Sequence, residues 1–137
     1  VIVVFFLFWN FLAHMIFALF LGTVTLTNVT SSFGVFATAE GMTMLAVGTG
    51  VGAVFATLLY SLTVVSLPLL LHREVDFVTA MITSFALVRD NPVVMLAWGA
   101  FIAACLFVAM LPMFLGLFVA LPLLGHASWH LYRRAIR

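Results

Sequence analysis

Two pairs of polar residues stand in an otherwise apolar chain at a spacing that could support chemistry. His126 and His130 lie four residues apart in the closing stretch "GHASWHLYRRAIR", and Asn10 and His14 have the same separation near the start of the chain. Residues i and i+4 share one face of a helix, which is how paired metal or haem ligands are often presented. His14, His126 and His130 are therefore the candidate cofactor-binding residues.

A simpler interpretation exists for both pairs, and we favour it. Asn and His side chains inside membrane segments often join helices by hydrogen bonds, so Asn10 is expected to serve helix packing. His126 and His130 provide only two ligands, which is too few for a metal site, and His72 belongs to a different element. We therefore expect no metal and no cofactor, with haem or a pigment as the open alternative.

No set of residues typical of catalysis can be assembled from the chain. There is no Ser-His-Asp set, zinc-protease motif or phosphate-binding loop, and the apolar segments contain no facing carboxylates. The single cysteine, Cys105, lies within an apolar run, so no disulfide framework is expected. The sequence predicts no enzyme activity and no catalytic residue.

The composition predicts a membrane protein. Hydrophobic residues make up 66% of the 137 residues and charged residues only 7%, and the mean hydropathy is +1.36. A soluble domain carries about 25% charged residues, whereas apolar runs of about 18 residues or more are typical of membrane spans. The few arginines form no broad basic face, so we expect membrane lipids as partners and no nucleic acid.

The apolar runs predict an all-α polytopic helical membrane protein that forms a single transmembrane domain. The stretch from Pro92 to Ile136 would be about 67 Å long as one helix, more than twice the hydrocarbon thickness, so it must break near Pro112. The segment before it is also long, and tilt, extension past the membrane or a kink at Pro68 would accommodate it. We expect about four transmembrane helices near residues 1–21, 41–71, 92–110 and 113–136, and a short interfacial helix near 75–88.

The small residues predict how these helices pack, and the arginines predict which ends of the helices lie on the cytoplasmic side of the membrane. Gly48, Gly52 and Ala56 recur every four residues, a pattern that lets two helices approach closely, and we favour packing within the chain over a dimer interface. All five arginines lie in the loop after the second helix or in the C-terminal tail. By the positive-inside rule the C-terminus is cytoplasmic, which predicts a multi-pass protein of the bacterial inner membrane.

Along the C-terminal stretch the residue types change from apolar to aromatic to basic, as is typical of a membrane anchor. Aromatic residues sit where interfacial belts form, and the arginines after them attract anionic headgroups by about 1 kcal/mol each. The expected lipid-headgroup and anchor residues are Trp129, Tyr132, Arg133, Arg134 and Arg137.

Three segments resemble an integral membrane family of prokaryotes catalogued as domain of unknown function 2189. They are "SLPLLLHREVDFVTAMITS" at 66–84, "NPVVMLAWGA" at 91–100 and "LPLLGHASWHLYRR" at 121–134, so the resemblance lies mainly in the C-terminal part. It implies a helical membrane protein. Because members are longer than this chain, it also implies that further helices precede Val1. The family brings no reaction with it.

For function, the sequence favours an accessory or assembly subunit of a larger energy-transducing membrane complex, respiratory or photosynthetic, bound to other integral membrane subunits. A small-solute transporter or channel subunit is one alternative, because Asn10, His14 and several hydroxyl side chains could line a path. A cofactor-binding electron-transfer subunit is the other. The partner, the solute or cofactor and the oligomeric state do not follow from the sequence.

Overall fold

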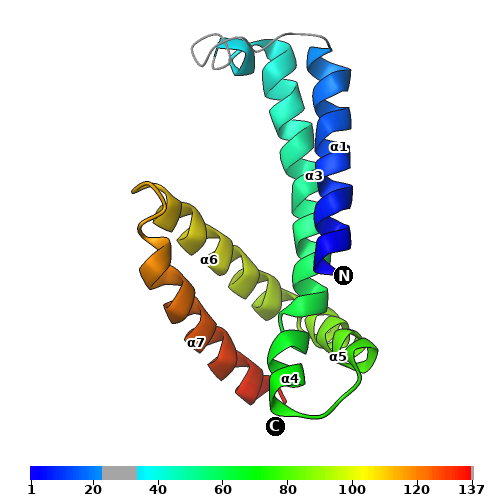
Figure 1. The fold of residues 1–137 in the computed structure, drawn as a ribbon, viewed down its shortest axis with the longest axis vertical. Coiled ribbons are helices and arrows are strands. Elements are labelled where there is room, and N and C mark those ends of the chain that lie inside the picture. Colours follow the sequence, from blue (N-terminus) through cyan, green and yellow to red (C-terminus); the bar gives the residue numbers. More distant parts are fainter. Residues whose placement is uncertain (23–33, 137) are drawn as a thin grey trace. The chain divides into compact units, whose positions relative to one another are not determined.

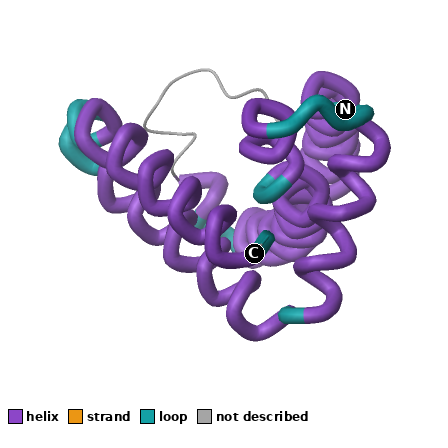
Figure 2. Tube along the Cα trace, turned by 90° about the horizontal axis from the view of Figure 1, so that it is seen from below, coloured by secondary structure: helices purple, strands orange, loops and turns teal. Residues whose placement is uncertain are grey.

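The structure is a computed structural model that describes residues 1–22 and 34–136. Within these residues every regular element is a helix and none is a strand (Figure 2), which confirms the all-α fold class. In chain order the helices are α1 Ile2–Leu21, α3 Ala39–Thr63, α4 Ser66–His72, α5 Phe77–Asp90, α6 Pro92–Met110 and α7 Leu117–Ala135 (Figure 1). They form two compact units, Val1–Leu59 and Tyr60–Arg137, and the boundary falls within α3.

Three helical segments of the described chain are long and apolar enough to cross a membrane: Ile2–Leu21, Ala39–His72 and Pro92–Met110. The helix α7 is the fourth span expected from the sequence, but it does not meet the same measure of length and hydropathy. Its second half contains two histidines and two arginines, which lower its mean hydropathy. The expected number of about four spans is therefore approximate, and α7 is the helix in question.

In the first unit, α1 and α3 lie side by side (Figure 1). They pack through aromatic side chains. The ring of Phe55 contacts Phe5 edge-on at a centroid distance of 6.0 Å and lies 6.2 Å from the ring of Trp9. Gly52 allows the close approach, because a Cβ at this position would lie 2.9 Å from Cη2 of Trp9. Small and aromatic residues thus fit together as complementary shapes.

The long apolar segment expected at 41–71 is divided into α3 and α4 by a break at Val64 and Val65, not by a kink at Pro68. At the break, the backbone N–H of Val65 donates to Oγ of Ser84 at 3.1 Å, and that hydroxyl donates to the carbonyl of Ser61 at 2.7 Å. In an unbroken helix the Val65 N–H would bond to the Ser61 carbonyl directly. The Ser84 hydroxyl therefore bridges an interrupted helical hydrogen bond.

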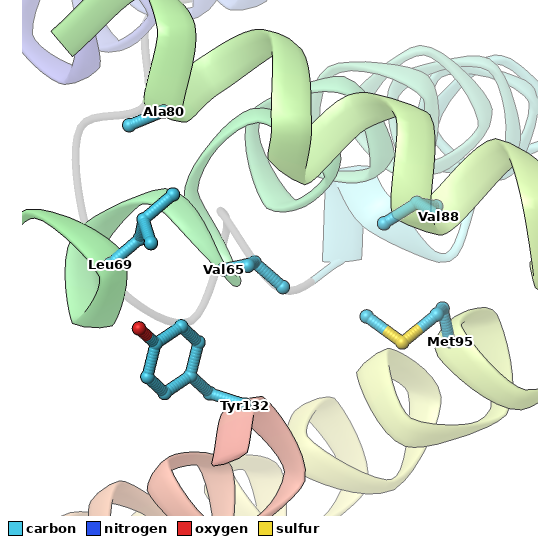
Figure 3. Close-up of a cluster of buried hydrophobic side chains, with 6 residues drawn as sticks. All are labelled: Val65, Leu69, Ala80, Val88, Met95 and Tyr132. Carbon is cyan, nitrogen blue, oxygen red and sulfur yellow. The ribbon is translucent and has the colours of Figure 1, made fainter. Parts of the chain in front are cut away.

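The core of the second unit gathers side chains from α4, α5, α6 and α7. Val65, Leu69, Ala80, Val88, Met95 and Tyr132 form one buried cluster (Figure 3). Tyr132 is the largest of them, and its side chain is only 1% exposed. The end of α3 joins the same unit, since the Tyr60 hydroxyl donates to the Met95 carbonyl at 2.8 Å.

The helix α5 corresponds to the interfacial helix expected near 75–88. Its N-terminus is capped by Asp76, whose carboxylate accepts from the N–H groups of Val78 and Thr79. Its buried residues are the small side chains of Ala80 and Ser84 together with Val88, whereas the aromatic side chains of Phe77 and Phe85 are exposed. Small residues face the core because they let α5 lie close to α4.

The reversal between α6 and α7 takes more residues than the sequence suggested, so α7 begins at Leu117 and not near residue 113. Met113 and Phe114 have positive φ angles of 49° and 66°, a left-handed conformation that non-glycine residues seldom adopt. Gly116 closes the turn, because a Cβ there would lie 2.6 Å from the carbonyl oxygen of Ala109. The chain therefore needs residues 111–116 to turn back on itself.

Candidate functional site

A polar site of the second unit lies where the C-terminal ends of α4 and α7 meet. A cavity of about 520 Å³ is lined there by His72, Arg73, His130, Tyr132, Arg133 and Arg134, together with Ile136. We refer to it as the arginine cavity. No aspartate or glutamate is among its lining residues, so any small molecule attracted there is expected to be an anion.

Aromatic packing holds one wall of the arginine cavity. The hydroxyl of Tyr132 lies 3.0 Å from Nδ1 of His72. The His72 ring also meets the rings of Trp129 and Tyr132 edge-on, each at a centroid distance of 5.9 Å. Because Tyr132 is buried in the core, these contacts fix the position of His72 at the end of α4.

The arginines of the cavity are not neutralised by the protein. Within the part of the chain that the structure describes, the only ion pair joins Arg89 and Asp90 at 3.2 Å, outside the cavity. Arg73, Arg133 and Arg134 are exposed, and none has a carboxylate within 4.0 Å among the described residues. Three guanidinium groups can therefore offer their donors to a bound anion.

The two histidines of the C-terminal pair have different surroundings. Their ring centroids are 6.4 Å apart and both side chains are exposed. His130 lines the arginine cavity, whereas His126 is not among its lining residues. Among residues 1–22 and 34–136, no group of three or more His, Cys, Asp or Glu side chains could hold a metal ion.

Asn10 and His14 form their hydrogen bonds within α1. The amide of Asn10 donates to the Phe6 carbonyl at 3.3 Å, and Nδ1 of His14 lies 2.8 Å from the Asn10 carbonyl. A carbonyl oxygen can only accept, so Nδ1 carries a proton, and in the neutral imidazole Nε2 keeps its lone pair. His14 is exposed on α1, which leaves Nε2 accessible from outside the helix.

The small-residue face of α3 is occupied at one position and open at another. Gly52 lies against Trp9, but a Cβ built at Gly48 would meet nothing within 4 Å. Gly48 and Gly52 line an apolar groove of about 380 Å³ between α1 and α3. Gly52 and Ala56 line a second apolar groove of about 390 Å³.

The expected anchor residues do not all reach the surface. Arg133 and Arg134 are exposed and Trp129 is half-buried. Tyr132 differs from the expectation: its side chain packs between α4 and α7 in the core of the second unit and is buried. Arg137 lies outside the described residues.

The sequence interpretation missed the contribution of α4 to this site. Arg73 belongs to the charged stretch "HREVD" in the loop expected after the second helix, and His72 was assigned to a different element from His126 and His130. Only the packing of α4 against α7 brings them beside Arg133 and Arg134. The signal available in the sequence was the concentration of charge directly after an apolar run.

Comparison with known families identifies the chain. A family model described as "Predicted integral membrane protein (DUF2189)" matches residues 1–72. The chain belongs to the DUF2189 family. The match covers α1, α3 and α4, so of the segments that suggested the family only residues 66–72 lie inside it. No curated protein and no solved structure matches the chain.

This DUF2189 protein is an integral membrane protein, and its apolar surface is consistent with contact with lipids. Only 6% of the apolar window in each of Ile2–Leu21 and Pro92–Met110 is buried within the protein. Phe6, Phe8 and Phe11 on α1 are each more than half exposed. Such surface is stable when it faces hydrocarbon or another helix.

Proposed function

We propose that this DUF2189 protein is a non-catalytic accessory or assembly subunit of a larger energy-transducing complex, respiratory or photosynthetic, in a bacterial inner membrane. The observation that carries the proposal is the open small-residue face of α3 at Gly48. The positions of the five arginines support an orientation with the C-terminus in the cytoplasm.

The groove at Gly48 suits a transmembrane helix of another subunit. Its walls are apolar side chains of α1 and α3, among them Phe17 and Leu45, and its floor contains Gly48. Small residues at a helix surface allow a second backbone to approach closely, which increases van der Waals contact within the membrane. Because Trp9 already covers Gly52, Gly48 is the position left for a partner.

Replacing Gly48 with leucine is expected to release the partner subunits while leaving the fold intact. The added side chain has open space in the protein itself but would overfill a helix interface, which costs about 1–3 kcal/mol and lowers the affinity for the partner about 5- to 150-fold. Native electrophoresis of mild-detergent membrane extracts, with mass spectrometry of respiratory and photosynthetic subunits in the same band, measures the loss.

The matched control is Gly50→Leu, because Gly50 lies on the same helix, is exposed and has equal space around it. Gly50 lines neither groove, so its variant should retain the partners. A wild-type protein that runs as a partner-free particle in these extracts would contradict the proposal. Equal loss in both variants would show that the groove is not the interface.

A cofactor-binding electron-transfer subunit is the second candidate, favoured by the geometry of His14. Its Nδ1 is held by the Asn10 carbonyl, which leaves Nε2 as the nitrogen that a haem iron would take. The transporter alternative has less support, since hydroxyls such as those of Thr43 and Thr57 donate to carbonyls of their own helix.

If the second candidate is correct, the protein purified from its native membrane will show a Soret or pigment band. His14→Ala is then expected to remove the band, because it removes the exposed imidazole of α1. Leu19→Ala, at another exposed position of α1, serves as the control and should leave it unchanged. A purified wild-type protein that is colourless in the visible range would eliminate this candidate.

A further inference from the structure

We propose that the end of the second unit binds one anionic phospholipid, with its phosphate in the arginine cavity and its acyl chains in an adjoining apolar cavity. The site needs no partner subunit, because all of its residues lie in Tyr60–Arg137. It differs from the general attraction of arginines to a charged membrane surface, since it is a built cavity with defined walls.

The arginine cavity has the chemistry of a phosphate site. Arg73 comes from the end of α4, and Arg133 and Arg134 come from α7. Basic residues at helix ends often bond the last carbonyls of the helix. Within the described residues, however, none of these three side chains donates such a hydrogen bond or forms an ion pair. One guanidinium group can donate two parallel hydrogen bonds to the oxygens of a phosphate. These unused donors therefore favour a phosphate ligand.

A second cavity, of about 690 Å³, shares two lining residues with the arginine cavity. His130 and Arg134 line both. The remaining walls are mainly apolar and come from α5, α6 and α7, with Leu87, Val94, Met95, Trp98, Ala127 and Leu131 among them. We refer to it as the tryptophan cavity. Trp98 lies six residues into α6, which places it about 9 Å along the helix from its start.

Trp98, which lines the tryptophan cavity, also carries a polar group without a partner. The indole nitrogen Nε1 of Trp98 is buried and has no hydrogen-bond acceptor in the described part of the protein. A buried donor of this kind normally has a partner. An ester carbonyl of a phospholipid, which lies between the phosphate and the acyl chains, would supply one.

These observations favour a lipid over free phosphate as the ligand. Inorganic phosphate would satisfy the arginines but would leave the tryptophan cavity and the Trp98 N–H unfilled. A phospholipid has its charge, its ester carbonyls and its apolar chains in the same order as the arginines, Trp98 and the apolar walls. The lipid must be anionic, because no carboxylate lines the arginine cavity to attract a choline or ethanolamine group.

The test is native mass spectrometry of the full chain released from vesicles of phosphatidylglycerol and phosphatidylcholine in equal amounts. The wild-type protein is expected to retain phosphatidylglycerol in preference to phosphatidylcholine. Arg73→Gln and Arg134→Gln should each lower its retention about tenfold, as expected for losing a charged hydrogen-bond donor. Ala127→Phe should do the same by filling the tryptophan cavity without changing the charge.

Two control variants distinguish binding at a defined site from the general effects of losing a positive charge or of adding a bulky side chain. Arg89→Gln removes one positive charge from a residue that is paired with Asp90 and lines neither cavity, so it should retain lipid. Ala104→Phe adds the same bulk at an exposed position of α6 and should also retain lipid. Thermal unfolding of each variant verifies the fold, and Arg73→Gln, at an exposed position, tests the proposal even if Ala127→Phe does not fold.

Three results would overturn the proposal. Equal retention of the two lipids would show that the site does not select a lipid by its net charge. A loss in Arg89→Gln equal to that in Arg134→Gln would show a diffuse attraction to the membrane. Stabilisation of the lipid-free wild-type protein by inorganic phosphate, unchanged by Ala127→Phe, would identify free phosphate as the ligand.

Discussion

Tyr132→Ala is expected to lower the free energy of unfolding by about 3–5 kcal/mol, the usual cost of truncating a large buried aromatic side chain. Tyr132 is 1% exposed and lies in the cluster that joins α4, α5, α6 and α7. Its removal would leave a cavity between α4 and α7 and would also release His72. Denaturant unfolding in mild detergent, followed by tryptophan fluorescence, measures the change.

Tyr132→Phe and Phe118→Ala are the controls for this prediction. Phenylalanine keeps the ring and loses only the hydrogen bond to His72, which is expected to cost about 0.5–1.5 kcal/mol. Phe118 is 81% exposed on the same helix, so its truncation should change the stability by less than about 0.5 kcal/mol. A small effect of Tyr132→Ala, comparable to that of Phe118→Ala, would contradict the packing described for this core.

Ser84→Ala is expected to destabilise the protein by about 1–3 kcal/mol, the cost of leaving a buried polar group without its partner. The Ser84 side chain is completely buried. Its hydroxyl accepts from the Val65 N–H and donates to the Ser61 carbonyl at the break between α3 and α4. Without it, the Val65 N–H loses this partner, and the break loses the bridge between its two sides.

The neighbouring residue offers a matched control. Thr83 also carries a hydroxyl, but it donates to the Thr79 carbonyl within α5, whose backbone remains hydrogen-bonded without it. Thr83→Val should therefore have an effect of less than about 0.5 kcal/mol. Hydrogen exchange at the Val65 amide supplies a second readout, since exchange there should accelerate in Ser84→Ala alone. Unchanged protection at Val65 would show that Ser84 does not hold the break.

Some fold details followed from local patterns and others did not. Proline at 92, directly after Asn91, correctly predicted where α6 begins, because proline is favoured in the first turn of a helix. The break between α3 and α4 had no comparable local signal, since it depends on a hydroxyl from α5. The start of α7 was misplaced because the left-handed residues Met113 and Phe114 are not typical turn formers.

The candidate site shows the same division. The sequence identified the C-terminal arginines as groups that attract anionic headgroups, because their charge and their place after an apolar run are local properties. It placed Tyr132 at the surface, since tyrosine is common in interfacial belts. Whether such a ring faces lipid or the core depends on a neighbour, here α4, which is 60 residues away in the chain at His72.

The sequence by itself determined that this protein lies in a lipid bilayer and that its secondary structure is helical. In a bilayer the backbone N–H and C=O groups of a long apolar run must form hydrogen bonds within the protein, and a helix forms them within the run itself. This requirement is the same whichever residues the helix packs against. Only the tertiary structure decided which polar groups meet. The Ser84 hydroxyl bonds to the Val65 N–H at the break, and Arg73 lines one cavity with Arg133 and Arg134, because helix packing brings together residues that are distant in the chain. Such contacts depend on shape and close approach, which residue spacing along one helix does not encode.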